Sequence, residues 1–281
     1  GLTLSAEDKE YQEAHGLDDA QMAWRQNKIR ELKHEWLFRQ EYPATSQAAF
    51  QASGEGCFIR PELVVKARKF KAGDVASPLV LGVDPARGGG DKCGLVSREG
   101  RVAGRLICER MDTDDLMAIV GRVVRFINEH KPAVVAIDTT GLGAGVYDRL
   151  KELGHAGSGK PVKPVNFAQE AILRDRYINK RAEMWDEMRQ WFEDPAGVSI
   201  PDNDALQADV CGPSWGKGGT RFDSSARLVL EAKEHIRERM SMSPDLGDAL
   251  ALTFAFPIAQ ALPKPTVQAK GPTLNAGGWM R

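Results

Sequence analysis

Residues 79–84 read LVLGVD, an apolar run that ends in a carboxylate. A run of this length without polar alternation is typical of a strand buried on both faces of a sheet. Residues 133–138 read AVVAID and repeat the pattern, again ending in Asp. These two segments therefore predict buried central strands, with Asp84 and Asp138 at their carboxyl ends.

The segments around these strands alternate between strand and helix patterns. This order predicts an α/β domain, a mixed β-sheet flanked by helices on both faces. In chain order we expect a hairpin (92–97 and 101–109), a helix from Thr113, as N-cap, to Glu129, a helix at 143–153, a strand at 162–167, a helix at 173–192, a second hairpin (222 with 228–230) and a final helix at 245–256, with Ser243 as N-cap and Pro244 as its first residue.

Three regions differ in composition. Residues 1–55 read as helical and polar, with too little apolar mass for a core of their own. Residues 56–260 hold the predicted sheet and its helices. Residues 261–281 are rich in Pro and Gly, which predicts a flexible tail.

The composition excludes several classes of protein. The 281 residues contain 38 Lys and Arg against 39 Asp and Glu, so the chain has no broad basic coat, although a local basic face remains compatible with this balance. The four cysteines form no CxxC pair, which argues against a zinc cluster or a disulfide framework and favours a cytosolic compartment. We expect no membrane partner, because the longest apolar-rich stretch, 249–263, contains Pro257 and Gln260.

Carboxylates at unusual positions are the main chemical signal. If the strands that end at Asp84 and Asp138 are neighbours, the two carboxylates lie about 5 Å apart and repel each other unless a cation or proton is shared. Asp245 and Asp248 share one face of the last predicted helix. Convergent carboxylates form an all-oxygen site for Mg²⁺ or Mn²⁺, and two such ions can support phosphodiester hydrolysis.

Each carboxylate also has a structural interpretation. An Asp at a strand end is often a turn former, and Asp138 precedes a Thr-Thr-Gly turn. Asp245 lies near the start of its helix, where the helix dipole favours a negative charge. Asp248 is expected past the first turn, where capping does not explain it.

Residues 154–161 read GHAGSGKP and nearly match a P-loop. Pro161 replaces the hydroxyl that binds Mg²⁺, and a helix rather than a strand precedes the segment. We therefore interpret it as a loop that binds no nucleotide.

Four motifs, in order along the chain, resemble those of the large terminase subunits of tailed bacteriophages and prophages. Residues 38–45 (FRQEYPAT) with 48–50 (AAF) resemble the segment between the ATPase and nuclease regions. Residues 82–91 (GVDPARGGGD) and 136–141 (AIDTTG) resemble the first and second acidic motifs of the nuclease. Residues 231–234 (EAKE) and 243–250 (SPDLGDAL) resemble the third motif with its preceding segment.

The resemblance implies an RNase H-like fold and a two-metal endonuclease that cuts concatemeric viral DNA during genome packaging. It implies Asp84, Asp138 and Asp248 as catalytic metal ligands for Mg²⁺ or Mn²⁺, with Asp245 as a possible fourth. It also implies that residues 1–55 are a helical linker following an ATPase domain that this sequence lacks. The implied partners are double-stranded DNA, the portal protein, the small terminase subunit and the ATPase domain. The implied compartment is the host cytoplasm, in a packaging motor absent from the mature virion.

Local cations near the predicted site are candidates for contacts to DNA phosphates. They are Arg87, Lys92, Lys217, Arg221 and Lys233. Each is equally compatible with ordinary solvated surface charge, so we expect DNA binding to be weak and sensitive to salt.

Three other functions remain open from the residues alone. The acidic residues also suit a junction resolvase or transposase, which share the RNase H-like architecture. Glycine-rich turns beside Asp84 and Asp138 also suit an actin-like ATP-binding module. A docking module in which the carboxylates are structural is the third alternative.

Overall fold

The computed structural model of the chain describes residues 4–32, 35, 38, 42, 56–71, 77–86, 92–240 and 243–258. Most of the segment predicted to join the ATPase and nuclease regions, residues 38–50, therefore lies outside the described residues. Arg87 and the predicted tail at 261–281 lie outside them as well.

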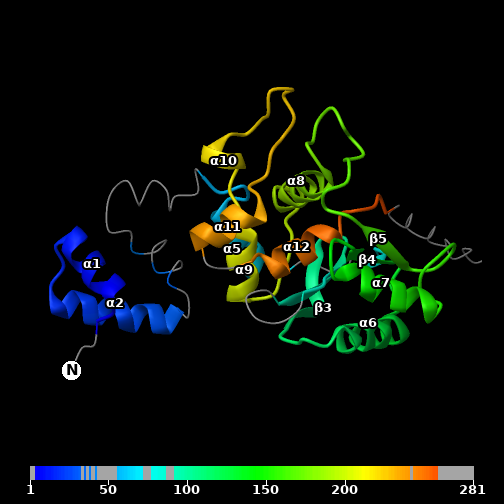
Figure 1. Cartoon of the computed structure of the whole chain (residues 1–281), viewed down its shortest axis with the longest axis horizontal. Coiled ribbons are helices and arrows are strands. Elements are labelled where there is room, and N and C mark those ends of the chain that lie inside the picture. Colours follow the sequence, from blue (N-terminus) through cyan, green and yellow to red (C-terminus); the bar gives the residue numbers. More distant parts are fainter. Residues whose placement is uncertain are drawn as a thin grey trace, which may run out of the picture.

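A five-stranded mixed sheet forms the centre of the molecule (Figure 1). Its order is β3-β2-β1-β4-β5, in which β1 is antiparallel to β2 and parallel to β4. This arrangement confirms the predicted mixed sheet and its hairpin, and it makes the two buried strands neighbours, which the sequence analysis had left open. The strands are β1 (Leu79–Asp84), β2 (Cys93–Glu99), β3 (Val102–Met111), β4 (Val134–Asp138) and β5 (Val162–Val165).

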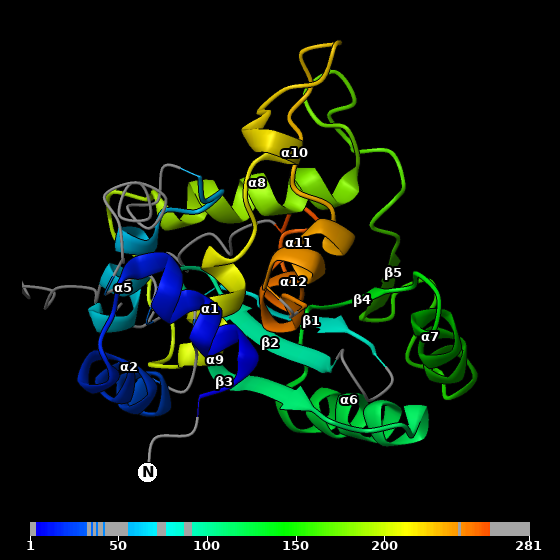
Figure 2. The ribbon, with the colours of Figure 1, turned by 60° about the vertical axis from the view of Figure 1, so that its left-hand side comes forward.

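Helices cover both faces of this sheet, and each face has its own apolar core (Figure 2). One face carries α6 (Leu116–His130) and α7 (Gly143–Glu152). The other carries α5 (Pro61–Lys69), α8 (Lys180–Phe192), α9 (Asp204–Cys211) and α12 (Asp245–Leu252). The short helices α10 (Gly216–Gly219) and α11 (Lys233–Met240) lie between α9 and α12 in the chain.

The described part of the N-terminal segment includes the helices α1 (Ala6–His15) and α2 (Asp19–Leu32). Ser5 caps α1, and Gly16 ends it in the left-handed conformation. Arg25 of α2 forms an ion pair with Asp8 at 2.8 Å, and its guanidinium lies over the ring of Tyr11. The expected helical character of this region is therefore present in its described part. No helix in the described part of the chain is long and apolar enough to cross a membrane.

Several predicted boundaries were wrong. The helix expected at 173–192 begins only at Lys180, because Asn179 caps it and residues 168–179 form a loop. Asp115, rather than Thr113, caps α6 by accepting a hydrogen bond from the Met117 amide at 2.8 Å. The final helix has Pro244 as its N-cap and ends at Leu252, short of the predicted 256. The second predicted hairpin is reduced to isolated bridges, including Phe222 with Leu228.

Helix α12 lies unusually close to the sheet because glycines face it. A Cβ atom on Gly82 of β1 would lie 1.8 Å from the Ala249 carbonyl oxygen, and one on Gly94 of β2 would lie 2.3 Å from that of Asp245. Atoms cannot approach so closely, so only glycine permits this spacing at either position. The two glycines thereby bring the acidic end of α12 close to the strand ends.

We predict that Gly82→Ala destabilises the protein by about 3 kcal/mol or more, because the new methyl group must displace helix backbone. The matched control is Gly121→Ala in α6, where a Cβ meets nothing within 4 Å. Higher helix propensity there should stabilise the protein by roughly 0.5–1 kcal/mol. Urea unfolding measures both changes, and equal midpoints for the two variants would contradict the close-packing account.

Candidate active site

Two parallel strands end in carboxylates at the same edge of the sheet. Asp84 is the last residue of β1, and Asp138 is the last residue of β4. Gly82 pairs with Ala136 in the parallel register, so the two carboxyl ends are neighbours, which meets the condition set in the sequence analysis. Asp84 is 5% exposed and Asp138 is 6% exposed, so both carboxyl groups have lost most of their hydration.

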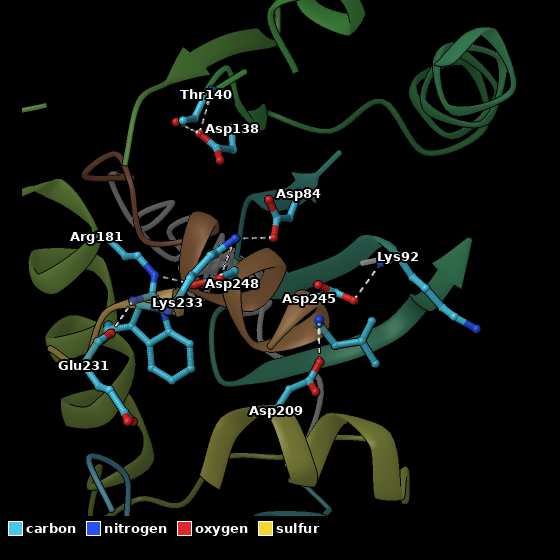
Figure 3. Close-up of polar contacts among 12 residues, drawn as sticks. Asp84, Lys92, Asp138, Thr140, Arg181, Asp209, Glu231, Lys233, Asp245 and Asp248 are labelled. Atoms are coloured by element: carbon cyan, nitrogen blue, oxygen red, sulfur yellow. Dashed lines mark hydrogen bonds and ion pairs between the residues drawn. The ribbon is translucent and has the colours of Figure 1, made fainter. Parts of the chain in front are cut away.

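Helix α12 brings two further carboxylates to this edge (Figure 3). Asp248 is fully buried, and Asp245 is 4% exposed. Both lie in the first turn of α12, so the expectation that Asp248 falls beyond this turn was wrong. The helix dipole therefore favours a negative charge at both positions.

Lys233, the first residue of α11, lies between two of these carboxylates. Its Nζ atom lies 3.1 Å from Asp84 Oδ2 and 2.9 Å from Asp248 Oδ2 (Figure 3). The ammonium also lies 5.0 Å from the centre of the Phe167 ring. The sequence suggested Lys233 as a contact for a DNA phosphate. In the structure its ammonium forms ion pairs with Asp84 and Asp248.

Asp248 is held by donors that the sequence analysis missed. Its Oδ1 atom accepts hydrogen bonds from Trp185 Nε1 at 2.7 Å and Arg181 Nε at 3.0 Å. Arg181 in turn donates to the carbonyl of Glu231 at 2.8 Å, which ties α8 to the start of α11. Oδ2 is left paired with Lys233, in a geometry that is not that of a hydrogen bond. Both donors are on α8, which carried no chemical motif, so no local sequence signal indicated them.

Asp138 uses one of its two carboxylate oxygens for structural contacts. Its Oδ1 atom accepts hydrogen bonds from the Thr140 amide at 3.0 Å and the Thr140 hydroxyl at 2.7 Å. The turn-forming role considered for this residue is therefore present. These bonds occupy one carboxylate oxygen and fix the orientation of the other.

Burial and crowding shift the ionisation of these groups. Burial raises the pKa of Asp84 to about 7, with Asp248 and Asp138 adding to the rise and Lys233 opposing it. Burial also raises the pKa of Asp138 and of Asp245. For Asp248 the effect of burial is outweighed by Arg181 and Lys233, which hold its pKa below the ordinary value. Burial alone would lower the pKa of Lys233, but the charges of Asp248 and Asp84 raise it above the ordinary value.

The donor set suits a hard divalent cation, although it is not arranged as a finished metal cage. Within the described ranges, no group of three or more His, Cys, Asp or Glu side chains is placed to hold a metal ion. The Lys233 ammonium instead lies between Asp84 and Asp248, as a cation already compensating the two carboxylates. Carboxylate oxygens are the ligand type that Mg²⁺ and Mn²⁺ prefer, so the chemistry of Asp84, Asp138 and Asp248 suits these ions.

Asp209 supports the site from outside and was also missed by the sequence analysis. It is fully buried on α9, and its Oδ2 atom accepts a hydrogen bond from the Leu246 amide at 2.7 Å. Pro244, the N-cap of α12, offers no side-chain acceptor, so Asp209 caps α12 from a different helix. Arg110 of β3 pairs with the other oxygen of Asp209.

The remaining predicted DNA contacts are dispersed. The Lys92 side chain pairs with Asp112 at 3.0 Å, while its amide donates to Asp245 Oδ2 at 3.0 Å. The Arg221 guanidinium lies 4.9 Å from the centre of the Trp215 ring. The side chain of Lys217 and all of Arg87 lie outside the described residues. None of these phosphate contacts is tested by the geometry, so they stay predictions.

No protein-family model matches the sequence, and no curated protein matches it. Among solved structures, the nuclease domain of the large terminase subunit gp2 of bacterial virus Sf6 matches with a TM-score of 0.57 and 21% identity, over 72% of this chain and 99% of that domain. A variant of that domain with manganese and beta-thujaplicinol matches with a TM-score of 0.58 and 20% identity, over 72% of this chain and 99% of the other.

The matches identify the fold. The chain is an α/β protein of RNase H-like fold, in agreement with the five-stranded mixed sheet. Within that class, its fold is that of the nuclease domains of phage large terminase subunits. The resemblance of the four sequence motifs to terminase subunits predicted this fold, and the matches confirm it.

We predict that Asp209→Ala lowers the free energy of unfolding by about 3 kcal/mol, because it removes the cap of α12 and the partner of Arg110. Asp209→Asn keeps an acceptor for the Leu246 amide and should cost less. The control is Asp204→Ala on the same helix, which removes a partly exposed ion pair with Arg68 and should cost under about 1 kcal/mol. Thermal and urea unfolding provide the comparison, and an equal loss at positions 204 and 209 would contradict the capping role.

Proposed function

We propose that this chain is a metal-dependent DNA endonuclease, the nuclease portion of a phage large terminase subunit, which cuts concatemeric viral DNA during genome packaging. The observation that carries the proposal is the convergence of Asp84, Asp138 and Asp248 at one sheet edge. The fold, which resembles terminase nuclease domains, supports it.

In this proposal Asp84, Asp138 and Asp248 hold Mg²⁺ or Mn²⁺, with two ions expected and Asp245 as a possible additional ligand. Bound divalent ions supply an activated water and stabilise the leaving oxygen in phosphodiester hydrolysis. The metal-bound form of the neighbour fold, solved with manganese, is consistent with this choice of ion.

The chain's own residues have distinct roles in this proposal. Arg181 and Trp185 hold one oxygen of Asp248, so that the other remains directed toward Asp84 and Lys233. Thr140 orients Asp138 in the same way. Lys233 neutralises the carboxylates before a metal binds, and its ammonium must leave the space between Asp84 and Asp248 for a cation to enter.

The proposed domain organisation is a helical linker at 1–55, an RNase H-like nuclease at 56–260 and a tail at 261–281. The proposed substrate is double-stranded DNA. The proposed partners in the assembled motor are the portal protein, the small terminase subunit and the ATPase domain. The proposed setting is the host cytoplasm, outside the mature virion.

We expect the purified chain to nick or linearise plasmid DNA with Mg²⁺ or Mn²⁺ and to be inactive with EDTA. Asp84→Asn and Asp138→Asn should each abolish cleavage while retaining the fold, because an amide is isosteric with a carboxylate but a poor ligand for a divalent cation. Asp148→Asn, an exposed position on α7, is the matched control and should cleave normally.

Cleavage that resists EDTA would reject the metal-dependent function, and a fully active Asp84→Asn would reject that ligand assignment. Symmetric cleavage of four-way junctions in preference to duplex DNA would favour a junction resolvase instead.

A second prediction separates the two carboxylates of α12. Asp248→Ala should eliminate cleavage, because Asp248 contacts the Lys233 ammonium directly and faces Asp84. Asp245→Ala should lower activity or stability without eliminating cleavage, because the Asp245 carboxylate accepts a hydrogen bond from the Lys92 amide and has this structural role. A nicking assay, performed after circular dichroism has shown that both variants fold, gives the order. An inactive Asp245→Ala beside an active Asp248→Ala would reverse the assignment.

A further inference from the structure

A hollow lined by three lysines lies where β4 begins, at the end of the sheet opposite to the end that carries the carboxylates. Its lining comes from the end of α6, the connection into β4, the loop before β5 and β5 itself, and its volume is about 470 Å³. The lining residues are Ile127, Lys131, Pro132, Ala133, Gly159, Lys160, Pro161 and Lys163. The loop is the one whose sequence nearly matches a P-loop.

The hollow gathers positive charge without compensation. Lys131 and Lys160 are exposed and Lys163 is half-buried, and in the described part of the structure none of the three forms an ion pair. No carboxylate is among the lining residues. In a chain whose net charge is −1, three uncompensated lysines around one concavity form a local attraction for anions.

The backbone at Lys131 adds an independent observation. Lys131 ends α6 in the left-handed conformation, with φ at 49°. Glycine or asparagine is the usual residue there, because this conformation brings a Cβ atom too close to the backbone carbonyl oxygen. The lysine charge complements the helix dipole, and the side chain lines the hollow despite the unfavourable backbone.

The position of the hollow relative to the carboxylates favours an extended anion. Ala133, the residue before β4, lines the hollow, and Asp138 ends β4 five residues later. At about 3.3 Å per residue, Ala133 and Asp138 are about 16 Å apart along the chain, which corresponds to about five base pairs along a duplex. Lys163 lies on β5, which is an outer strand of the sheet, so among the described residues no further strand covers the path between Ala133 and Asp138.

We propose that this hollow binds phosphates of the DNA backbone about five base pairs from the scissile position, so that the duplex runs along the β5 edge of the sheet. This inference rests on the proposed nuclease function. The lysines act here as positioning residues, which contact the duplex away from the reacting phosphate.

The test uses two variants of the whole chain, and each variant loses three lysine charges. One replaces the hollow lysines, Lys131→Ala, Lys160→Ala and Lys163→Ala. The control replaces three exposed lysines on and just after α5, Lys66→Ala, Lys69→Ala and Lys71→Ala, which lie over the other face of the sheet. Because the net charges are equal, any difference between the variants reports position rather than total charge.

Fluorescence anisotropy with a duplex of about 30 base pairs in EDTA, over a series of salt concentrations, measures affinity without cleavage. The slope of log K against log salt should flatten by about 0.9 for each lost phosphate contact, hence by up to about 3 in the hollow variant. The control variant should keep the wild-type slope. Circular dichroism verifies that both variants are folded.

Equal slopes for the two variants would overturn the proposal. Tighter binding of polyglutamate by the wild type than by the hollow variant, together with equal DNA slopes, would overturn it in favour of an acidic protein partner. The two variants could differ in slope as predicted while the wild-type chain cleaves no DNA with Mg²⁺ or Mn²⁺. This result would refute the nuclease function but leave the DNA contact in place.

Discussion

The burial of several carboxylates at one sheet edge is the constraint on which the rest of the structure depends. Asp84, Asp138, Asp245 and Asp248 are each less than a tenth exposed, and buried like charges repel strongly. The chain compensates them with Lys233 and Arg181, which come from different helices. The path of the chain through α8 and α11 is thereby tied to the electrostatics of the sheet edge.

The sequence was sufficient to predict a mixed sheet and the carboxylates that end two of its strands, but not the order of the strands. Uninterrupted apolar runs before Asp84 and Asp138 identify buried strands, and such runs are informative because they reflect burial on both faces. The contacts of Trp185, Arg181 and Asp209 could not be predicted in the same way. Each acts on a residue far away in the chain, and no local spacing encodes such a pairing. The start of α8 was misplaced for a related reason, since residues 173–179 have helix-compatible side chains but are held in a loop by contacts to α8. Glu183, for example, accepts hydrogen bonds from the Ile172 and Leu173 amides.

Two supports of Asp248 have different physical origins. Because Gly82 and Gly94 have no Cβ atom, α12 can lie close to the strands. Hydrogen bonds from Trp185 and Arg181 fix the orientation of the Asp248 carboxylate. Distance and orientation are thus controlled by separate residues. A ligand geometry that depends on both needs rigid elements on each side, and the close packing of α12 against β1 and β2 provides one of them.

The separation of these residues along the chain has a consequence for the time at which the site exists. Lys233 and Asp84 are 149 positions apart, and Asp248 follows later still. Contacts between such distant segments form late, because the intervening chain must first be ordered. During synthesis, β1 and β4 emerge well before α12, so their paired carboxylates lack both Asp248 and the compensating lysine. The growing polypeptide therefore carries an incomplete site until its last described helix has been made.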